Sequence, residues 1–145
     1  MIKRIMVPTD GSDFSRKALK TALDLARKFQ AEIVLLYVPH TPEAYWGYNP
    51  AFTITVTDEQ KKQIKDAGDK TIKYTLKDFD LSDIVMKTKI IQGNPSNVIL
   101  EEVSNEKIDL IIMGSHGYGV MAGAVLGSVS QRVLRKSTCS VLIAK

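Results

Sequence analysis

Short apolar segments alternate along the chain with longer segments of helical periodicity. The apolar segments lie at residues 3–9, 32–38, 84–91, 108–113 and 139–144. The second of them is almost continuously apolar, as expected for a strand buried on both faces of a sheet. Strands that alternate with helices form a parallel sheet covered by helices on both faces. The sequence therefore predicts an α/β fold with right-handed crossovers.

Helical patterns fill most of the intervals between the apolar segments. Each has a start signal: Ser12 or Asp13 as a cap, a capping box at 57–60, Asn94 before Pro95, and Ser128. The apolar face of the second pattern is expected at Ile64, Ala67, Thr71, Ile72, Leu76 and Phe79. Residues 39–56 hold three prolines and no clear period, which predicts a long loop.

The composition is that of an ordinary globular protein. The 145 residues predict one domain over 1–145, and 44% apolar with 25% charged residues excludes disorder, collagen and coiled coil. No apolar stretch of about 20 residues predicts a membrane span, and the first residues lack a signal-peptide hydrophobic region. The single Cys139 excludes an internal disulfide framework and a cysteine-rich zinc site. We therefore expect a cytoplasmic protein without membrane association.

The positive charge is confined to the end of the chain. All 16 acidic residues precede Leu110, so the formal charge of +4 comes from Arg132, Arg135, Lys136 and Lys145. One interpretation is a site for an anion; the other is that the first three of these side chains favour the C-terminal end of a helix. No dense basic run with interleaved aromatics is present, so nucleic acid is not an expected partner.

A glycine-rich segment at residues 114–130 lies in this acid-free region and joins a predicted strand to a predicted helix. Glycines let backbone amides approach a ligand closely, and a helix N-terminus offers unpaired N–H groups to phosphate. Ser128 and Ser130 can donate hydroxyl groups to phosphate or cap the helix; the alternative is a flexible loop with Ser128 as its N-cap. A triphosphate here would require a divalent metal.

Two common phosphate-binding loops do not match. A Walker loop needs Lys followed by Ser or Thr after its last glycine, but Ser128 and Val129 follow Gly127. The segment 117–122 fits the dinucleotide fingerprint formally, but that fingerprint requires an acid about 20 residues further on. No acid follows Asp109, so both alternatives are rejected.

The end of the first strand offers a second half of the site. Pro8, Thr9 and Asp10 lie at its carboxyl end, and ligands of open parallel sheets bind outside such ends. If the first and fourth strands are neighbours, Asp10 can meet the glycine-rich segment. Asp10 is then suited to accept a hydrogen bond from a ribose hydroxyl or to bind a metal. The alternative is that it forms a local Asx-turn.

These motifs resemble the universal stress protein family over essentially the whole chain. The matching segments are IMVPTDGS at 5–12, LLYV at 35–38, GNPSNVIL at 93–100, DLIIMGSHG at 109–117 and SVLIAK at 140–145. The spacing of Gly114, Gly117, Gly127 and Ser128 is that of the ATP-binding branch: Gly, two residues, Gly, nine residues, Gly, then Ser or Thr.

The resemblance implies a Rossmann-like open parallel five-stranded sheet of order 3-2-1-4-5, with helices on both faces. It implies a homodimer joined through the last strand at 141–143, and ATP with Mg²⁺ or Mn²⁺ as the ligand. The implied contacts to base and ribose are Pro8, Thr9, Asp10 and Val38. The implied contacts to ribose and phosphates are Met113, Gly114, Gly117, Gly127, Ser128, Val129 and Ser130.

One position departs from the family pattern. Many relatives carry a basic residue after the second glycine, where this chain has Tyr118, and residues 118–126 carry no charge. A metal or Arg132 is then needed to neutralise phosphate. The apolar side chains of Val120, Met121, Val125 and Leu126 offer the alternative of covering a pocket or a partner.

No catalytic constellation is evident in the sequence. His116 lies in the glycine-rich segment and is the candidate base; His40 is expected on the surface, and Cys139 in the core. Tyr45, Trp46 and Tyr48 are candidates for a lid or an interface. The first hypothesis is a nucleotide-dependent dimeric switch in the stress response, with at most slow ATPase activity. Two alternatives stay open: a slow Mg²⁺-dependent ATP hydrolase or nucleotidyl transferase using His116 or Asp10, and an interaction protein that binds a client.

Overall fold

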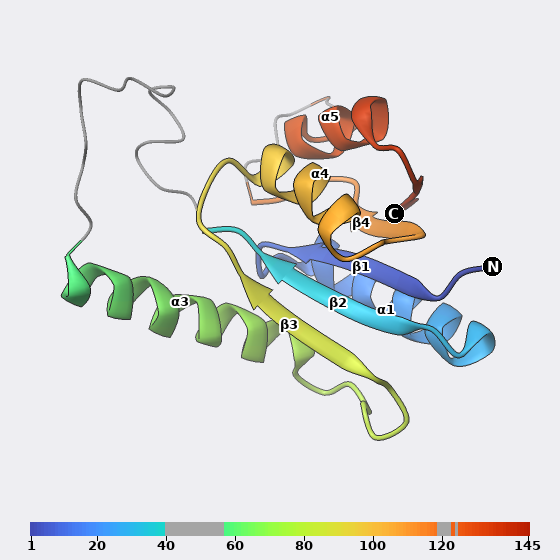
Figure 1. Ribbon diagram of the computed structural model, residues 1–145, viewed down its shortest axis with the longest axis horizontal. Coiled ribbons are helices and arrows are strands. Elements are labelled where there is room, and N and C mark those ends of the chain that lie inside the picture. The colour runs from blue at the N-terminus through green and yellow to red at the C-terminus, as the bar shows by residue number, and fades with distance from the viewer. Residues whose placement is uncertain (40–56, 119–122, 124) are drawn as a thin grey trace.

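The computed structural model describes residues 1–39, 57–118, 123 and 125–145, and it contains one five-stranded parallel sheet with helices on both faces (Figure 1). The strands are β1 (Arg4–Thr9), β2 (Glu32–Tyr37), β3 (Met86–Ile90), β4 (Leu110–Gly114) and β5 (Ser140–Ala144). The helices are α1 (Asp13–Phe29), α3 (Asp58–Leu76), α4 (Pro95–Asn105) and α5 (Ser128–Lys136). No helix in these ranges is long and apolar enough to cross a membrane.

The strand order is β3-β2-β1-β4-β5, which confirms the Rossmann-like order 3-2-1-4-5. In register, β1 pairs with β2 from Arg4 opposite Glu32 to Thr9 opposite Tyr37. The other neighbour of β1 is β4, so the two strands that lead into the expected site are adjacent. All strands are parallel, and their carboxyl ends therefore meet at one edge of the sheet.

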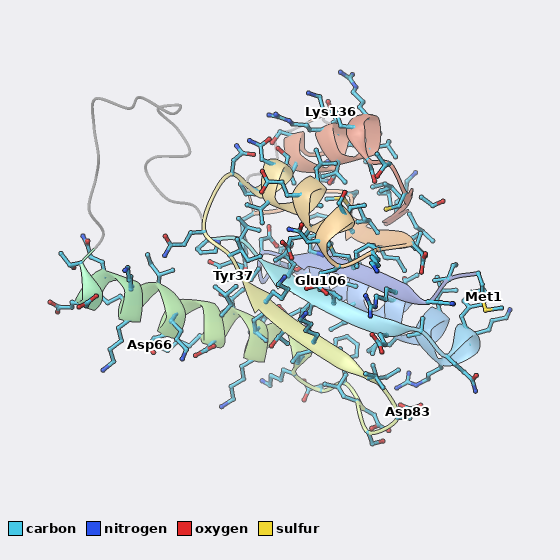
Figure 2. All side chains as sticks on the ribbon, in the orientation of Figure 1. Met1, Tyr37, Asp66, Asp83, Glu106 and Lys136 are labelled. Carbon is cyan, nitrogen blue, oxygen red and sulfur yellow. The ribbon has the colours of Figure 1, made fainter. Side chains whose placement is uncertain are left out.

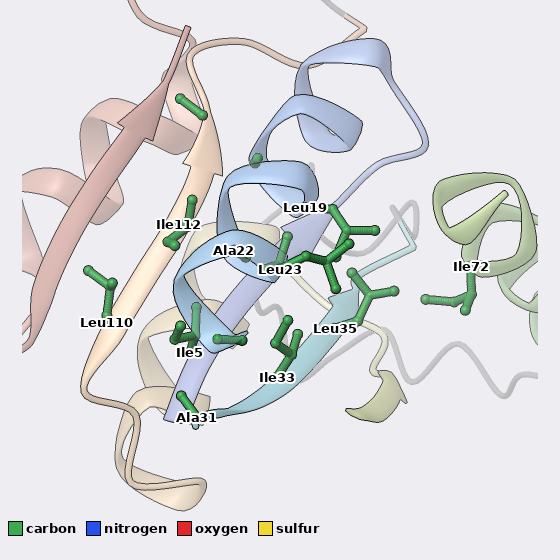
Figure 3. Packing of buried hydrophobic residues seen from close by; sticks show 14 residues of the cluster. Ile5, Leu19, Ala22, Leu23, Ala31, Ile33, Leu35, Ile72, Leu110 and Ile112 are labelled. Atoms are coloured by element: carbon green, nitrogen blue, oxygen red, sulfur yellow. The ribbon is translucent and has the colours of Figure 1, made fainter. Parts of the chain in front are cut away.

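Each face of the sheet carries its own apolar core. On one face, Leu19, Ala22 and Leu23 of α1 pack over Ile5 and other strand residues, and Ile72 of α3 joins them (Figure 3). On the opposite face, α4 and α5 cover a second cluster that includes Met6, Ile99 and Val133. β2 contributes alternate residues to both clusters, which confirms that it is buried on both sides.

Three of the four described helices begin with a side-chain cap. Ser12 accepts the N–H of Ser15 at the start of α1, Thr57 and Gln60 form the predicted capping box of α3, and Asn94 caps α4. The start of α5 differs, because its N-cap is Gly127 and no side chain caps it. The interpretation that Ser128 caps this helix is therefore wrong: Ser128 is its first helical residue.

The predicted apolar face of α3 needs a correction of one residue. Ala67 is exposed and Gly68 is buried, because α3 packs against Ile90 of β3 at Gly68. A Cβ at Gly68 would lie 2.8 Å from Cδ1 of Ile90. Phe79 lies beyond the end of α3, and the predicted strand at 84–91 is shorter, at Met86–Ile90. The sequence pattern located these elements but not the point of contact between them.

Ion pairs hold the edge strand β3 to α4. Lys89 contacts both Glu102 and Glu106, and Lys87 donates to Glu106 at 2.7 Å. Glu106 lies at the C-terminal end of α4, over the sheet (Figure 2). Hydrogen bonds from Lys87 and Lys89 lower the pKa of Glu106 to about 2. The buried Glu102 also accepts from the Asn105 amide at 2.8 Å, so its carboxylate is fully paired within this network.

Candidate functional site

The β1–α1 turn and the glycine-rich segment meet at the carboxyl edge of the sheet. β1 and β4 are paired neighbours, as Ile5 opposite Leu110 and Met6 opposite Ile111 show. Asp10 follows β1, and residues 115–118 follow β4. The backbone N–H of Tyr118 donates to Oδ2 of Asp10 at 3.1 Å. The structure thus confirms that Asp10 meets the glycine-rich segment.

Asp10 is held by donors from three places. Its Oδ1 accepts the N–H of Ser12 at 2.9 Å and the hydroxyl of Ser15 at 3.3 Å, and its Oδ2 accepts the N–H of Tyr118. The bond to Ser12 is the Asx-turn that the sequence offered as the alternative. Because the turn and the contact to Tyr118 use different oxygens, the local role of Asp10 does not prevent it from facing the loop.

Buried hydroxyl groups form hydrogen bonds beside the β1–α1 turn. Oγ1 of Thr9 lies 3.0 Å from Oγ of Ser15 and 2.8 Å from Oγ1 of Thr75, and it accepts the N–H of Gly11 at 3.1 Å. Thr9, Ser15 and Thr75 are all buried. The structure therefore directs the Thr9 side chain toward α1 and α3, and a ligand at the sheet edge would meet only the backbone of Thr9.

Glycines in the segment allow three close approaches. A Cβ at Gly114 would lie 2.8 Å from the backbone of Phe14, and a Cβ at Gly117 would lie 2.3 Å from Oδ2 of Asp10. A Cβ at Gly127 would lie 3.3 Å from Cα of His116, and the N–H of Gly127 donates to Ser115 O at 2.7 Å. Gly114 thus serves packing against α1, whereas Gly117 makes room for the Asp10 carboxylate.

The start of α5 lies beside the same strand end. The buried Ser130 donates its hydroxyl to Gly114 O at 2.9 Å, which ties α5 to the end of β4. Ser128 is exposed, and the first turn of α5 contains no acidic residue. The uncapped helix end therefore presents backbone N–H groups and the exposed Ser128 hydroxyl, whereas the hydroxyl of Ser130 is already used.

Apolar residues from β1, from β4, from α5 and from just after β2 form a wall on the α4 and α5 face. Val38 and Met113 are buried in one cluster there, and Val129 packs against it. Pro8 follows Met6 by two positions on β1 and so faces the same side of the sheet. The structure therefore brings Val38, Met113 and Val129 together, whereas the Thr9 side chain contacts protein partners.

The remaining candidates fall in different places. Nδ1 of His116 lies 3.0 Å from the Ser115 hydroxyl, and its ring packs 5.4 Å from that of Phe14. Arg135 and Lys136 lie in the last turn of α5, as the structural interpretation of the basic residues expects, whereas Arg132 lies earlier. Cys139, expected in the core as the first residue of the last strand, is only half-buried: it precedes β5 and packs against the second apolar cluster. His40, Tyr45, Trp46, Tyr48, Val120 and Met121 lie outside the described residues.

Comparison with known proteins identifies the family of this chain. Residues 1–145 match the model of the universal stress protein family. The chain belongs to the universal stress protein family. Two similar relatives are universal stress protein YxiE of Bacillus subtilis, 33% identical with both chains fully covered, and universal stress protein MJ0531 of Methanocaldococcus jannaschii. The latter is 32% identical over all of this chain and 83% of its own length.

Solved structures agree with the fold of this universal stress protein. The structure of MJ0577 is 29% identical and superposes with a TM-score of 0.79, covering all of this chain and 96% of the other. Two more distant structures of the same fold contain adenine nucleotides. One is a universal stress protein in complex with cAMP, at 24% identity and TM-score 0.61; the other is an Arabidopsis thaliana family member with AMP bound, at 18% and 0.64.

Metal ligands are sparse in this universal stress protein. Over residues 1–39, 57–118, 123 and 125–145, no three His, Cys, Asp or Glu side chains gather in one place. Asp10 is the carboxylate at the junction of turn and loop, and its Oδ2 accepts from the described residues only the N–H of Tyr118. One carboxylate together with phosphate oxygens is a usual arrangement for Mg²⁺, so the donor set fits a metal that arrives with a nucleotide.

Sequence reasoning missed the role of Tyr118. Its hydroxyl donates to Gly11 O at 2.7 Å, a contact that joins residues 107 positions apart. Gly11 adopts φ +81, which the Asp-Gly-Ser sequence can suggest. The partner of its carbonyl could not be read from the sequence, because it depends on the β1–β4 pairing.

Proposed function

We propose that this universal stress protein is an ATP-binding stress-response regulator, with the nucleotide held between the β1–α1 turn and the start of α5. The observation that carries the proposal is the contrast at the sheet edge: an uncapped, acid-free helix N-terminus faces a neighbouring turn that presents a carboxylate. The helix N-terminus suits a polyanion, and the carboxylate suits hydroxyl groups or a cation. A nucleotide with its metal ion brings phosphate, ribose hydroxyls and a cation together.

The phosphate side of the proposed site is formed mainly by backbone. Gly114, Gly117 and Gly127 let the chain turn closely at the end of β4, and the N–H groups of Ser128, Val129 and Ser130 open α5. The Ser128 hydroxyl is exposed beside them. Arg132 and a Mg²⁺ or Mn²⁺ ion are proposed to supply the positive charge that residues 118–126 lack. The ion would neutralise the triphosphate through the phosphate oxygens, which leaves Asp10 for the ribose.

The base is proposed to lie along the apolar wall of Pro8, Val38, Met113 and Val129. These residues share the α4 and α5 face of the sheet, and Asp10 directly follows β1, the strand that contains Pro8. Asp10 then accepts a ribose hydroxyl. The AMP and cAMP complexes of distant family members support adenine as the base, since they are proteins of the same fold.

We expect ATP turnover to be slow. The sequence shows no catalytic constellation, and the candidate base His116 contacts Ser115 and Phe14. A general base needs a positioned proton acceptor beside the attacking water. Nucleotide occupancy is therefore proposed to act through the order of the glycine-rich segment. A homodimer through the edge strand β5, at residues 141–143, would transmit it.

The test has two parts. Mass spectrometry of small molecules released from the purified, denatured protein should identify an adenine nucleotide. Isothermal titration with ATP, with and without Mg²⁺, should give one site per chain that loses affinity when Mg²⁺ is removed. Steady-state turnover should stay below the range of about 1–10³ per second that enzymes reach. Turnover in that range, abolished by His116→Ala, would instead support the hydrolase. A chain that neither releases nor binds an adenine nucleotide would refute the proposal.

A further inference from the structure

Tyr118 contacts the β1–α1 turn at two points. Its N–H donates to Asp10 Oδ2 at 3.1 Å, and its hydroxyl donates to Gly11 O at 2.7 Å. Yet 73% of the residue is exposed, so burial of the aromatic ring does not explain its position. The contacts that fix Tyr118 are polar, and both are made to the turn that carries Asp10.

Both sides of this contact are shaped to allow it. Gly11 adopts φ +81, and a Cβ there would lie 3.2 Å from Thr71 Cγ2 and 3.6 Å from the Tyr118 hydroxyl. A Cβ at Gly117 would lie 2.3 Å from Asp10 Oδ2. The loop and the turn can therefore approach this closely only with glycine at both positions. Partial burial, together with the nearby charge of Asp10, raises the pKa of Tyr118 above its ordinary value, which already keeps the phenol protonated at neutral pH.

Donors from the described residues leave Asp10 with one open acceptor position. A carboxylate has about four acceptor positions. On Asp10, Ser12 and Ser15 use Oδ1, and Tyr118 uses one position of Oδ2. The remaining acceptor position belongs to Oδ2, the oxygen next to Gly117. The open position therefore lies beside the glycine-rich segment.

We propose that Tyr118 is a positioning residue: by tying the loop to Gly11, it orients Asp10 Oδ2 toward a ribose hydroxyl of the bound nucleotide. This inference rests on the proposed nucleotide site and adds to it a determinant of ribose recognition.

The test compares Tyr118→Phe with the unsubstituted protein in titrations with ATP, 2′-deoxy-ATP and 3′-deoxy-ATP. Tyr118→Phe removes one hydrogen bond and keeps the ring. We expect ATP affinity to fall about two- to tenfold. The preference for ATP over the deoxy analogue that lacks the recognised hydroxyl should fall by a similar factor. In an Asp10→Asn background, Tyr118→Phe should have no further effect. Tyr74→Phe, in an exposed tyrosine on α3, is the matched control and should change neither quantity.

Different results would refute the positioning role of Tyr118 and the nucleotide site. If Tyr118→Phe binds ATP with an unchanged preference over both analogues, the positioning role is refuted and the nucleotide site stands. If the unsubstituted protein binds none of the three nucleotides, the proposed function fails and this inference fails with it. A loss of preference that persists in the Asp10→Asn background would also refute the inference, because it would show that Tyr118 acts on ribose without Asp10.

Discussion

Two strand-to-helix connections meet at the same edge of the sheet, and they differ in how they cap the helix that follows. After β1, the turn at residues 10–12 supplies polar groups to its helix: Ser12 caps α1, Asp13 lies in the first turn of α1, and Asp10 accepts three hydrogen bonds. After β4, the described part of the connection ends at Gly127, which gives α5 no side-chain cap and no acid in its first turn.

The difference is the reason to propose the phosphate site at the start of α5 and not at the start of α1. At the start of α1, the N–H of Ser15 is paired with the Ser12 hydroxyl oxygen, and Asp13 in the first turn offsets the helix dipole. At the start of α5, the described residues supply no side-chain cap and no acid, so they do not offset the helix dipole there. The β1 turn instead offers a carboxylate. The following substitutions test this division of roles, from the largest expected effect to the smallest.

Gly117→Ala should disrupt the junction most. The added Cβ would lie 2.3 Å from Asp10 Oδ2, so the loop or the carboxylate must move. At the cost of about 1–3 kcal/mol that is typical of overpacking, ATP affinity should fall about 10- to 100-fold by titration calorimetry. Gly93→Ala is the control, because Gly93 has φ +146 and lies at the end of β3. It should lower stability by about 1–3 kcal/mol and leave ATP affinity unchanged. Equal affinity losses in both variants would show that only global stability matters.

Asp10→Asn should have the next largest effect. The amide keeps the shape of the side chain but loses the charge that favours a ribose hydroxyl or a metal, so affinity for Mg²⁺-ATP should fall about tenfold. Asp109→Asn is matched to it, since Asp109 also accepts two backbone N–H groups, from Lys3 and Arg4, at the opposite edge of the sheet. Those bonds lower the pKa of Asp109, so its substitution should reduce stability on urea unfolding. A drop in ATP affinity in Asp109→Asn would contradict the assignment of the site to one edge.

The sequence was sufficient for the fold and for the two halves of the site. Alternating strand and helix patterns predict the parallel sheet, and its order brings Asp10 to the glycine-rich segment. The resemblance to the family adds Val38, Met113 and Val129, which the structure collects in one cluster. The site could be located because strand ends in a parallel sheet share an edge, whatever the details of packing.

The sequence could not assign the individual contacts. Thr9 and Ser130 carry hydroxyl groups beside the expected ligand, but both point to protein partners, at Ser15 and Gly114 O. Gly114 fits a phosphate loop by spacing, yet the structure requires it for the approach of Phe14. These roles depend on which face of an element each atom occupies, and spacing along the chain does not determine that.

Ser128→Ala and Ser130→Ala separate two serines that the sequence treats alike. Ser128 is exposed at the start of α5, so its loss should leave stability within about 0.5 kcal/mol and weaken ATP binding about two- to fivefold. Ser130 is buried, and its loss leaves Gly114 O without this donor, so stability should fall by about 1–3 kcal/mol in urea unfolding. The reverse pattern, with Ser128 important for stability, would restore the N-cap interpretation.

Ser12→Ala should have the smallest effect on the nucleotide, although it removes the cap of α1. The hydroxyl of Ser12 accepts the N–H of Ser15 at 3.3 Å, whereas Asp10 is bound by the backbone N–H of Ser12, which alanine retains. Thermal or urea unfolding should therefore show a loss of about 1 kcal/mol, typical of an N-cap, with ATP affinity unchanged within about twofold. If instead affinity fell as much as in Ser128→Ala, the start of α1 would also contact the nucleotide. The two helix ends would then share the phosphate, against the division of roles that their capping indicates.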